Sequence, residues 1–370
     1  MNEIRKIRKQ FPACKKYVYL NPAGGSPVSK NVYKAASTYY HEMLHEGDTL
    51  YETWLDRTEN VRKKLADFIG SGEDEVLFTA NTSHGMNLIA LMLNKDDEVI
   101  TMEDEFPSST IPWIHHGYKV RFVQPENHIY SAASIEKAIT PQTKIMVASY
   151  VQFNTGFRQD LKVLEEICRK HRLTFVLNAT QAMGVFPVDM KALNVDFMVF
   201  TGLKWPMAGY GIGGMYINRK HLGKLHFAQA GWQSVEHPES MDNKAAQLPH
   251  VASVMEPGVP HFPNIFALGA ALDLLDGIGH EKITNHIMKL NEILVSGLTD
   301  LGLEIISPLD PPHRSGITVV KVPDPGNVVE KLAAKNIIVA ARGEGIRISV
   351  HVFNNAHDVE KLIKNLSKVL

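Results

Sequence analysis

Cysteine is scarce in this sequence, which excludes two kinds of site. Of 370 residues only Cys14 and Cys168 are cysteines. Two cysteines with no CxxC spacing cannot build a disulfide framework or a four-ligand zinc site. We therefore expect no metal centre, and we expect a reducing compartment, the cytoplasm.

An excess of charge of either sign is also lacking. The 39 Lys and Arg residues nearly balance the 40 Asp and Glu residues, leaving a formal charge of −1. Nothing here resembles the basic surface of a nucleic-acid-binding protein. No stretch approaches the roughly 18 apolar residues of a membrane span, and the N-terminus lacks the apolar core of an export signal. We expect neither a nucleic-acid partner nor a membrane segment.

What the sequence does contain is a globular chain with a regular α/β pattern. Hydrophobic residues make up 44% and charged residues 21%, and the length suggests two domains. From about residue 76 to 218, short β-branched runs alternate with helical patterns. This favours a mostly parallel sheet covered by helices on both faces. The expected strands are 76–79, 98–102, 119–123, 144–149, 174–177, 196–200 and 214–217.

The rest of the chain has a different pattern. Residues 222–263 predict long loops, and the following segments predict a smaller α+β domain. Its expected helices are 264–278, 282–301, 330–335 and 358–370, and its expected strands are 304–306, 316–322, 337–341 and 346–352. We divide the chain into an N-terminal segment (1–20), a large α/β domain (21–255) and a small α+β domain (256–370).

Residues 196–205 (DFMVFTGLKW) carry the strongest chemical signal. An apolar strand delivers Thr201 and Lys204 into a glycine-rich turn, at the strand end where open α/β sheets bind ligands. Burial lowers the pKa of a lysine, so its neutral amine can attack a carbonyl. An ordinary surface lysine fits the local sequence equally well. The nearby GxGxxG pattern (209–214) precedes a strand rather than a helix, so we expect no dinucleotide site.

Two further segments bring polar side chains to the same edge of the sheet. Residues 176–182 (VLNATQA) place Asn178 and Gln181 after a strand. Residues 79–85 (TANTSHG) run from a strand into a helix that starts near Thr82. The free N–H groups and hydroxyls of Thr82 and Ser83 suit a phosphate, although both residues are also common helix caps.

With these segments in view, the sequence resembles the class V aminotransferases, fold-type I enzymes that bind pyridoxal phosphate. That family includes cysteine desulfurases, kynureninase and isopenicillin N epimerase-like proteins. The resemblance runs from about residue 19 to the C-terminus, and the EFPS wording is closest to the epimerase-like branch. Its ordered motifs are NTSHGMN (81–87), EDEFPSSTIPW (103–113), TGFRQDL (155–161), NATQAMGVFPVD (178–189), TGLKW (201–205), EPGVPHFPN (256–264) and RISVHVFNN (347–355).

The resemblance implies a pyridoxal phosphate cofactor and a role for each matching residue. Lys204 matches the catalytic lysine, which forms an aldimine with the cofactor and moves the Cα proton. Arg347 matches the arginine that grips the substrate α-carboxylate, although an ordinary ion pair remains an alternative. The other matches are cofactor-binding: Ser83, the backbone of Thr82 and Thr201 at the phosphate, Phe106 stacked on the ring, Gln181 at the phenolic oxygen and Asn178 at the pyridine nitrogen.

Three positions depart from the family pattern. Asn178 replaces an Asp that keeps the pyridine nitrogen protonated, so the ring should withdraw electrons less strongly. Leu203 and Val259 replace a His and a partner-subunit Thr that reach the phosphate. Because each charge-assisted hydrogen bond contributes about 1.5–3 kcal/mol, we expect weaker cofactor binding unless His84 or another group compensates.

These features leave three functional hypotheses. The first is an aminotransferase acting on a small amino acid. The second is an epimerase or a C–S or C–C lyase that uses the same cofactor, and the third is a degenerate, non-catalytic relative. A persulfide-type cysteine desulfurase is not expected, because residues 336–347 contain no cysteine and Cys168 belongs to an apolar helix face. The family also implies a homodimer with shared active sites.

Overall fold

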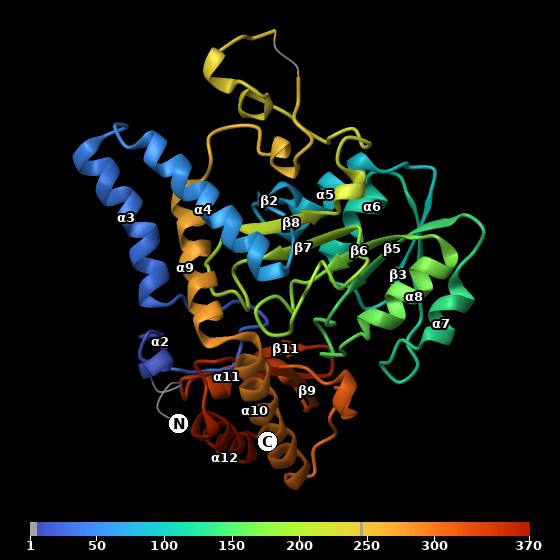
Figure 1. Cartoon of the computed structure of the whole chain (residues 1–370). Coiled ribbons are helices and arrows are strands. Elements are labelled where there is room, and N and C mark those ends of the chain that lie inside the picture. The colour runs from blue at the N-terminus through green and yellow to red at the C-terminus, as the bar shows by residue number, and fades with distance from the viewer. Residues whose placement is uncertain (1–5, 245–246) are drawn as a thin grey trace.

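The computed structural model describes residues 6–244 and 247–370, and Figure 1 shows a large sheet with its helices above a smaller α/β layer. Within the described residues, seven strands form the large sheet in the order β2-β8-β7-β6-β5-β3-β4. Only β8 runs antiparallel to its neighbours, so the predicted mostly parallel sheet is confirmed. The strands are β2 (Val76–Thr79), β3 (Glu98–Met102), β4 (Lys119–Val123), β5 (Thr143–Ser149), β6 (Thr174–Asn178), β7 (Phe197–Thr201) and β8 (Gly213–Ile217).

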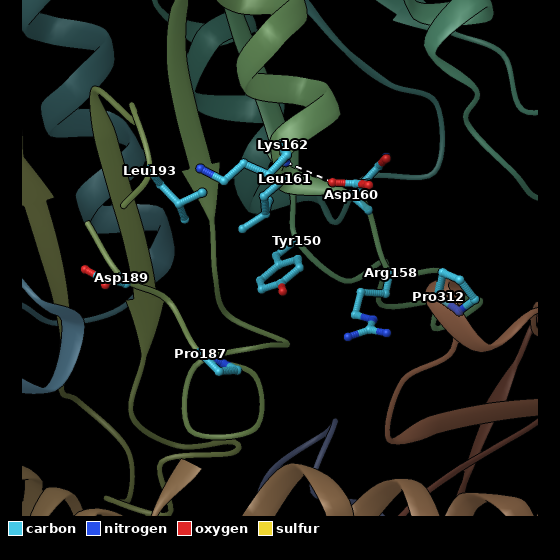
Figure 2. A pocket seen from close by; sticks show the side chains of 10 residues that line it. Tyr150, Arg158, Asp160, Leu161, Lys162, Pro187, Asp189, Leu193 and Pro312 are labelled. Carbon is cyan, nitrogen blue, oxygen red and sulfur yellow. Dashed lines mark hydrogen bonds between the residues drawn. The ribbon is translucent and has the colours of Figure 1, made fainter. Parts of the chain in front are cut away.

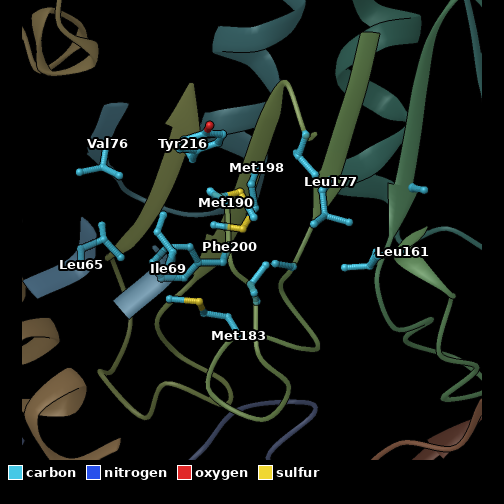
Figure 3. Close-up of a cluster of buried hydrophobic side chains, with 14 of the residues drawn as sticks. Leu65, Ile69, Val76, Leu161, Leu177, Met183, Met190, Met198, Phe200 and Tyr216 are labelled. Carbon is cyan, nitrogen blue, oxygen red and sulfur yellow. The ribbon is translucent and has the colours of Figure 1, made fainter. Parts of the chain in front are cut away.

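Helices cover both faces of this sheet because its central strands are apolar on both sides. In β7, Phe197 and Val199 pack on one face, while Met198 and Phe200 pack on the other. Continuous burial of this kind is typical of parallel strands. Figure 3 shows the second face, where Met198 and Phe200 lie among other buried side chains. The helices that follow strands are α5 (Thr82–Met92), α6 (Ile111–His115), α7 (Ala132–Ala138) and α8 (Leu161–His171).

Three longer helices complete the upper layer. Helix α9 (Phe262–Ile278) is buried beside α3 (Lys30–Glu46) and α4 (Tyr51–Ile69), and its apolar side chains belong to the large core. The first helix of the predicted small domain therefore packs with the large sheet. Among the described residues, no single helix is long and apolar enough to cross a membrane, although α9 and α10 (His280–Asp300), bent by 80°, pass that test together.

The lower layer is built on a three-stranded antiparallel sheet. Its order is β11-β12-β9, formed by β9 (Ile317–Lys321), β11 (Ala340–Arg342) and β12 (Gly345–Ser349). Helices α10, α11 (Pro325–Ala333) and α12 (Ala356–Val369) pack around it. The N-terminal segment joins this layer, because β1 (Val18–Tyr19), which follows α2 (Ala13–Lys16), pairs in parallel with β10 (Ile337–Ile338).

Four expected elements differ from those in the structure. The expected strand 346–352 ends at Ser349, as β12, and the expected helix 330–335 lies earlier, as α11. The other two are strands whose pairing differs. Residues 337–341 divide into β10 and β11, because Val339 lies between the two strands and they pair in different sheets. Residues 304–306 form only one bridge, Ile305 to Val320. There the Ser307 hydroxyl accepts the N–H of Val319 at 2.7 Å, which removes that backbone donor from further pairing. Short 3₁₀ turns lie at Glu73–Glu75, Pro107–Ser109, Arg219–His221, Trp232–Ser234, Pro238–Ser240, Ala252–Met255 and Pro311–His313.

Candidate functional site

The predicted site residues gather at the carboxyl-terminal edge of the large sheet. Thr201 ends β7 and Lys204 lies three residues later, while Asn178 ends β6 directly beside Ser149 of β5. Thr82 begins α5 after β2. Parallel strands that end at one edge bring residues far apart in sequence together there, as ligand sites in open α/β sheets require.

Lys204 is a half-buried lysine with no acidic partner among the described residues. Burial, together with the positive charges of Arg347 and Arg342, lowers its pKa to about 7. Its Nζ lies 5.4 Å from the centroid of the Phe106 ring. A substantial fraction of this lysine is therefore neutral at physiological pH, as a nucleophilic amine requires.

Phe106 forms one wall of the space in front of Lys204. Its ring is 42% exposed and packs edge-on against Phe153, with the two centroids 5.1 Å apart. A half-exposed aromatic ring beside the reactive amine can cover a flat ligand. This position agrees with the stacking role that the resemblance implies.

Arg347 is a buried guanidinium without a counter-charge. It is 1% exposed, it donates to the Phe153 carbonyl at 2.9 Å and to Asn21 Oδ1 at 3.4 Å, and its Nε has no partner. No carboxylate in the described part of the chain forms an ion pair with it. Burial, with Arg342 nearby, lowers its pKa to about 9. Because an unpaired buried charge is costly, this geometry fits an arginine that receives a ligand carboxylate.

Arg342 lies on the same face of the small sheet as Arg347. In the β11–β12 pair, Arg342 stands opposite Gly345 and Ala340 opposite Arg347, so the two arginines are diagonal neighbours. The Arg342 Nε is buried without a partner, and its one hydrogen bond within the described residues goes to the Ala341 carbonyl. The guanidinium groups of Arg342 and Arg347 thus lie near the Lys204 ammonium group, and no acidic side chain among the described residues pairs with any of them.

Gln181 has a fixed amide orientation. The indole N–H of Trp205 donates to its Oε1 at 2.7 Å, while its Nε2 donates to the Ala23 carbonyl at 3.1 Å. Trp205 is held in turn by His351, whose Nε2 bonds the Trp205 carbonyl at 2.8 Å. The amide nitrogen of Gln181 carries two hydrogens, and the bond to the Ala23 carbonyl uses one of them. The second N–H can therefore donate to an acceptor such as a phenolic oxygen.

The start of α5 offers donors for an anion. The cap residue Asn81 accepts the N–H of His84 at 3.0 Å, whereas the N–H groups of Thr82 and Ser83 stay unbonded within the described residues. The Thr82 hydroxyl pairs with that of Thr180 at 2.6 Å. The Thr201 hydroxyl is buried and has no hydrogen-bond partner in the described part of the chain. These groups suit a phosphate at a helix N-terminus.

His84 lines a pocket of about 340 Å³ together with Thr79 and Val259. Burial lowers the pKa of its imidazole. Its Nδ1 accepts the N–H of Ala80 at 3.2 Å, which leaves Nε2 as the protonated nitrogen. Val259 is 57% exposed and carries no donor. His84 therefore supplies a neutral N–H donor to this pocket, whereas the Val259 side chain has no donor to offer.

Asn178 is also fixed at both ends of its amide. Its Nδ2 donates to the Ser109 hydroxyl at 2.8 Å, and its Oδ1 accepts the N–H of Thr180 at 3.0 Å. The side chain is buried, with 3% of its surface exposed. It presents a neutral amide where the family resemblance implies a carboxylate.

The sequence prediction missed several residues of this site. Trp205, Arg342 and His351 were not singled out, and neither was the loop that contributes Asn21 and Ala23. The motifs that contain most of these residues were recognised, but their contacts join segments far apart in sequence. Arg342 alone had a local signal, because a hairpin with Gly343 at its turn places Arg342 and Arg347 on one face.

A second pocket lies elsewhere on the molecule. Figure 2 shows this space of about 360 Å³ near the start of α8, with Arg158, Tyr150 and Pro187 around it. The Arg158 guanidinium lies 4.5 Å from the centroid of the Phe186 ring. The lining residues include none of the predicted site residues, so this pocket is separate from the Lys204 site.

Comparisons with known proteins agree with this geometry. The model of the family described as Aminotransferase class-V matches residues 18–362. A probable cysteine desulfurase of Pyrococcus abyssi is 27% identical, with 98% of this chain and 97% of the relative covered. The uncharacterized aminotransferase YcbU of Bacillus subtilis is 24% identical with the same coverage. The solved complex of the cystine C–S lyase C-DES with cysteine persulfide superimposes with a TM-score of 0.90 at 22% identity, covering 97% of this chain and 99% of that one.

Proposed function

Because the chain belongs to the class V aminotransferase family and is thus a pyridoxal phosphate-dependent enzyme, we propose that it acts on the α-amino group of a small amino acid, as an aminotransferase. The family, the fold-type I architecture and the cofactor that the sequence predicted are confirmed. The observation that supports the proposed reaction is that Lys204 and Arg347 lie near each other in one site. The Lys204 amine, with its lowered pKa, can accept a proton from the substrate. The buried Arg347 guanidinium, which has no ion-pair partner among the described residues, can bind the α-carboxylate of an amino acid.

The described residues fit pyridoxal phosphate. The Thr201 hydroxyl and the N–H groups of Thr82 and Ser83 are unengaged polar groups that would hold the phosphate. The remaining N–H of Gln181 would meet the phenolic oxygen, and Asn178 would face the pyridine nitrogen. His84 offers a donor in place of those lost at Leu203 and Val259. When bound, the cofactor supplies an aldehyde for the amine and an electron-withdrawing ring for the bonds at Cα.

The side chains then divide the work. Arg347 binds the substrate α-carboxylate and fixes how the Cα bonds are oriented. Phe106 covers the reacting face and reduces access of water. Lys204, a substantial fraction of which is neutral near pH 7, accepts the Cα proton at Nζ and can return it to a second atom. Moving one proton between two positions is what transamination requires of a base.

Epimerisation or lyase chemistry is the second candidate, and Asn178 is the observation that favours it. A neutral amide withdraws less charge from the ring, which disfavours the extended charge delocalisation that transamination uses. Persulfide-type desulfuration lacks a nucleophile, because both cysteines are buried. Burial raises the pKa of Cys14 to about 11 and raises that of Cys168 as well, and Cys168 packs against Met146.

We propose a homodimer as the working form. Val259 is exposed at the position from which, by the family resemblance, a Thr reaches the phosphate of the partner subunit, and α3 presents apolar side chains to solvent. Both surfaces would be covered by a second copy of the chain.

The test is a single-turnover measurement on the protein loaded with pyridoxal phosphate. With its amino acid substrate, an aminotransferase converts the bound cofactor to the pyridoxamine form without added keto acid, and the visible absorbance falls. Borohydride should fix the cofactor on Lys204, as read from peptide mass. Lys204→Ala should slow turnover by at least about 10²-fold. Arg347→Gln should weaken substrate binding about 10- to 150-fold, and Arg347→Lys should recover part of that loss.

Other outcomes separate the alternatives. If the Cα proton exchanges while the cofactor keeps its aldehyde form, the reaction is epimerisation. If a keto acid is released while the cofactor keeps that form, the reaction is elimination. A wild-type protein that cannot be loaded with the cofactor would contradict the proposal altogether.

A further inference from the structure

Arg342 is a cation of the site that the proposed mechanism does not use. In the register of β11 and β12, Arg342 and Arg347 are diagonal neighbours on one face of the small sheet. Ile346 and Ile348, which flank Arg347 in β12, are buried in the core of the lower layer. Because side chains alternate along a strand, the two arginines project from the other face of the strand pair than these isoleucines.

A series of contacts connects this face with Lys204. Arg347 donates to the Phe153 carbonyl at 2.9 Å, and the Phe153 ring packs against that of Phe106. The centroid of the Phe106 ring lies 5.4 Å from Nζ of Lys204. The charges of Arg347 and Arg342 both contribute to the lowered pKa of Lys204. Arg342 therefore belongs to the same site as the reactive amine.

Arg342 has no ion-pair partner among the described residues. Its one hydrogen bond there goes from Nη1 to the Ala341 carbonyl at 2.9 Å, and its Nε is buried without a partner. The nearest acid in sequence, Glu344 of the same hairpin, binds Lys321 at 3.0 Å instead. An arginine keeps its charge at physiological pH, and a charge removed from water is costly unless it is paired. The described part of the chain thus leaves the charge of Arg342 uncompensated.

We propose that Arg342 is a substrate-specificity residue and that the substrate is an acidic amino acid, whose side-chain carboxylate binds Arg342 while its α-carboxylate binds Arg347. This rests on the proposed function, because it assumes the α-carboxylate on Arg347. A neutral amino acid compensates one guanidinium and leaves the other unpaired, whereas a second carboxylate compensates both. Diagonal neighbours in a strand pair lie about 7–8 Å apart, so two long side chains can hold both carboxylates of a short molecule such as aspartate or glutamate. Each guanidinium can bind its carboxylate through two N–H groups.

The first measurement is the binding of a substrate-like dicarboxylate to the holoenzyme, without any turnover. Succinate and its monoamide, succinamate, have nearly the same shape and differ by one negative charge, and calorimetry gives both dissociation constants. The wild-type protein should bind succinate at least about tenfold more tightly than succinamate. Arg342→Gln should abolish most of this preference by weakening the binding of succinate.

The second measurement compares the turnover of aspartate with that of asparagine, and of glutamate with glutamine. The wild-type protein should have a higher kcat/KM for at least one acid than for its amide. Arg342→Gln should raise the KM for that acid about 10- to 150-fold and leave the KM for the amide nearly unchanged. Arg347→Gln should weaken the binding of acid and amide alike, because both carry an α-carboxylate.

Lys335→Gln is the matched control. It removes one positive charge from the lower layer, and Lys335 is an exposed residue that is not among the groups that shift the pKa of Lys204. This variant should keep the wild-type preference for succinate and for the acidic amino acid. The proposal is overturned if the wild-type protein binds succinate no more tightly than succinamate, if Arg342→Gln weakens the binding of both equally, or if Lys335→Gln abolishes the preference as well.

The proposed transamination and the proposed substrate class fail separately. Binding of succinate needs no turnover, so it tests Arg342 even in an epimerase or a lyase. Conversion of the cofactor to its pyridoxamine form by neutral amino acids alone would uphold transamination and overturn the assignment of Arg342. Should Arg342→Gln fail to fold, Arg342→Lys, which keeps the charge but not the planar fork, should weaken the binding of succinate more than that of succinamate, and equal weakening overturns the proposal.

Discussion

At the scale of single residues, the site is defined by positive charges that lack acidic partners. Lys204 follows the large sheet, Arg342 and Arg347 belong to the three-stranded sheet, and the pKa shifts of Lys204 and Arg347 each have a nearby cation among their causes. Folding has placed charges together that repel each other, and bound anions relieve that repulsion. Such strain is expected where a ligand supplies the missing negative charge.

The lowered pKa of Lys204 predicts how cofactor loading depends on pH. Only the neutral amine attacks an aldehyde, so the rate at which apoprotein combines with pyridoxal phosphate should rise about tenfold per pH unit below about pH 7 and level off above it. Arg342→Gln removes a charge that lowers this pKa, so the midpoint should move upward by as much as about one pH unit. Stopped-flow absorbance at varied pH measures both.

Lys34→Gln serves as the control, because Lys34 is an exposed cation on α3 and not among the groups that shift Lys204. A midpoint close to the value of free lysine in the wild-type protein, or no response to Arg342→Gln, would contradict this account.

At the scale of elements, the phosphate site depends on how closely α5 approaches the sheet. A side chain at Gly85 would place its Cβ 2.7 Å from Cγ1 of Val199 in β7. Glycine therefore lets the first turn of α5 lie directly over the sheet, so that the N–H groups of Thr82 and Ser83 reach the same edge as Thr201. The requirement for glycine here comes from packing, since this residue lies in an ordinary helix.

Gly85→Ala should accordingly push α5 away from β7. We expect a loss of about 1–3 kcal/mol in the free energy of unfolding, measured by urea denaturation, together with weaker pyridoxal phosphate binding. Gly277→Ala in α9 is the matched control, because a Cβ there meets no atom within 4 Å. It should be neutral or stabilise by up to about 1 kcal/mol. Equal stability of the two variants would refute the packing argument.

At the scale of the whole molecule, α3 carries an unusual exposed surface. Tyr33, Tyr40 and Leu44 are 69%, 62% and 79% exposed. Their spacing of seven and four residues places them on one stripe of the helix. Contiguous apolar side chains on a surface are typical of a contact with another chain. We assign this stripe to the proposed homodimer.

The wild-type protein should therefore show twice its chain mass of 41.3 kDa by light scattering. Tyr40→Lys combined with Leu44→Lys should shift the protein towards the monomer while leaving its helical content intact. Lys34→Glu, on another side of α3, should leave the mass unchanged. A wild-type monomer, or a dimer indifferent to the stripe, would count against this assignment.

The sequence by itself predicted most of the elements and singled out Lys204, whereas the tertiary structure decided the contacts. Apolar periodicity, strand ends and the motif around Lys204 are local, so the seven strands of the large sheet were placed within one residue at each boundary. Two predictions failed where pairing decided the outcome: 337–341 and 304–306. The location of α9, the amide orientations of Gln181 and Asn178 and the pairing of Arg342 with Arg347 all depend on residues distant in the chain. Such contacts arise only when segments fold against one another, and no local pattern encodes them.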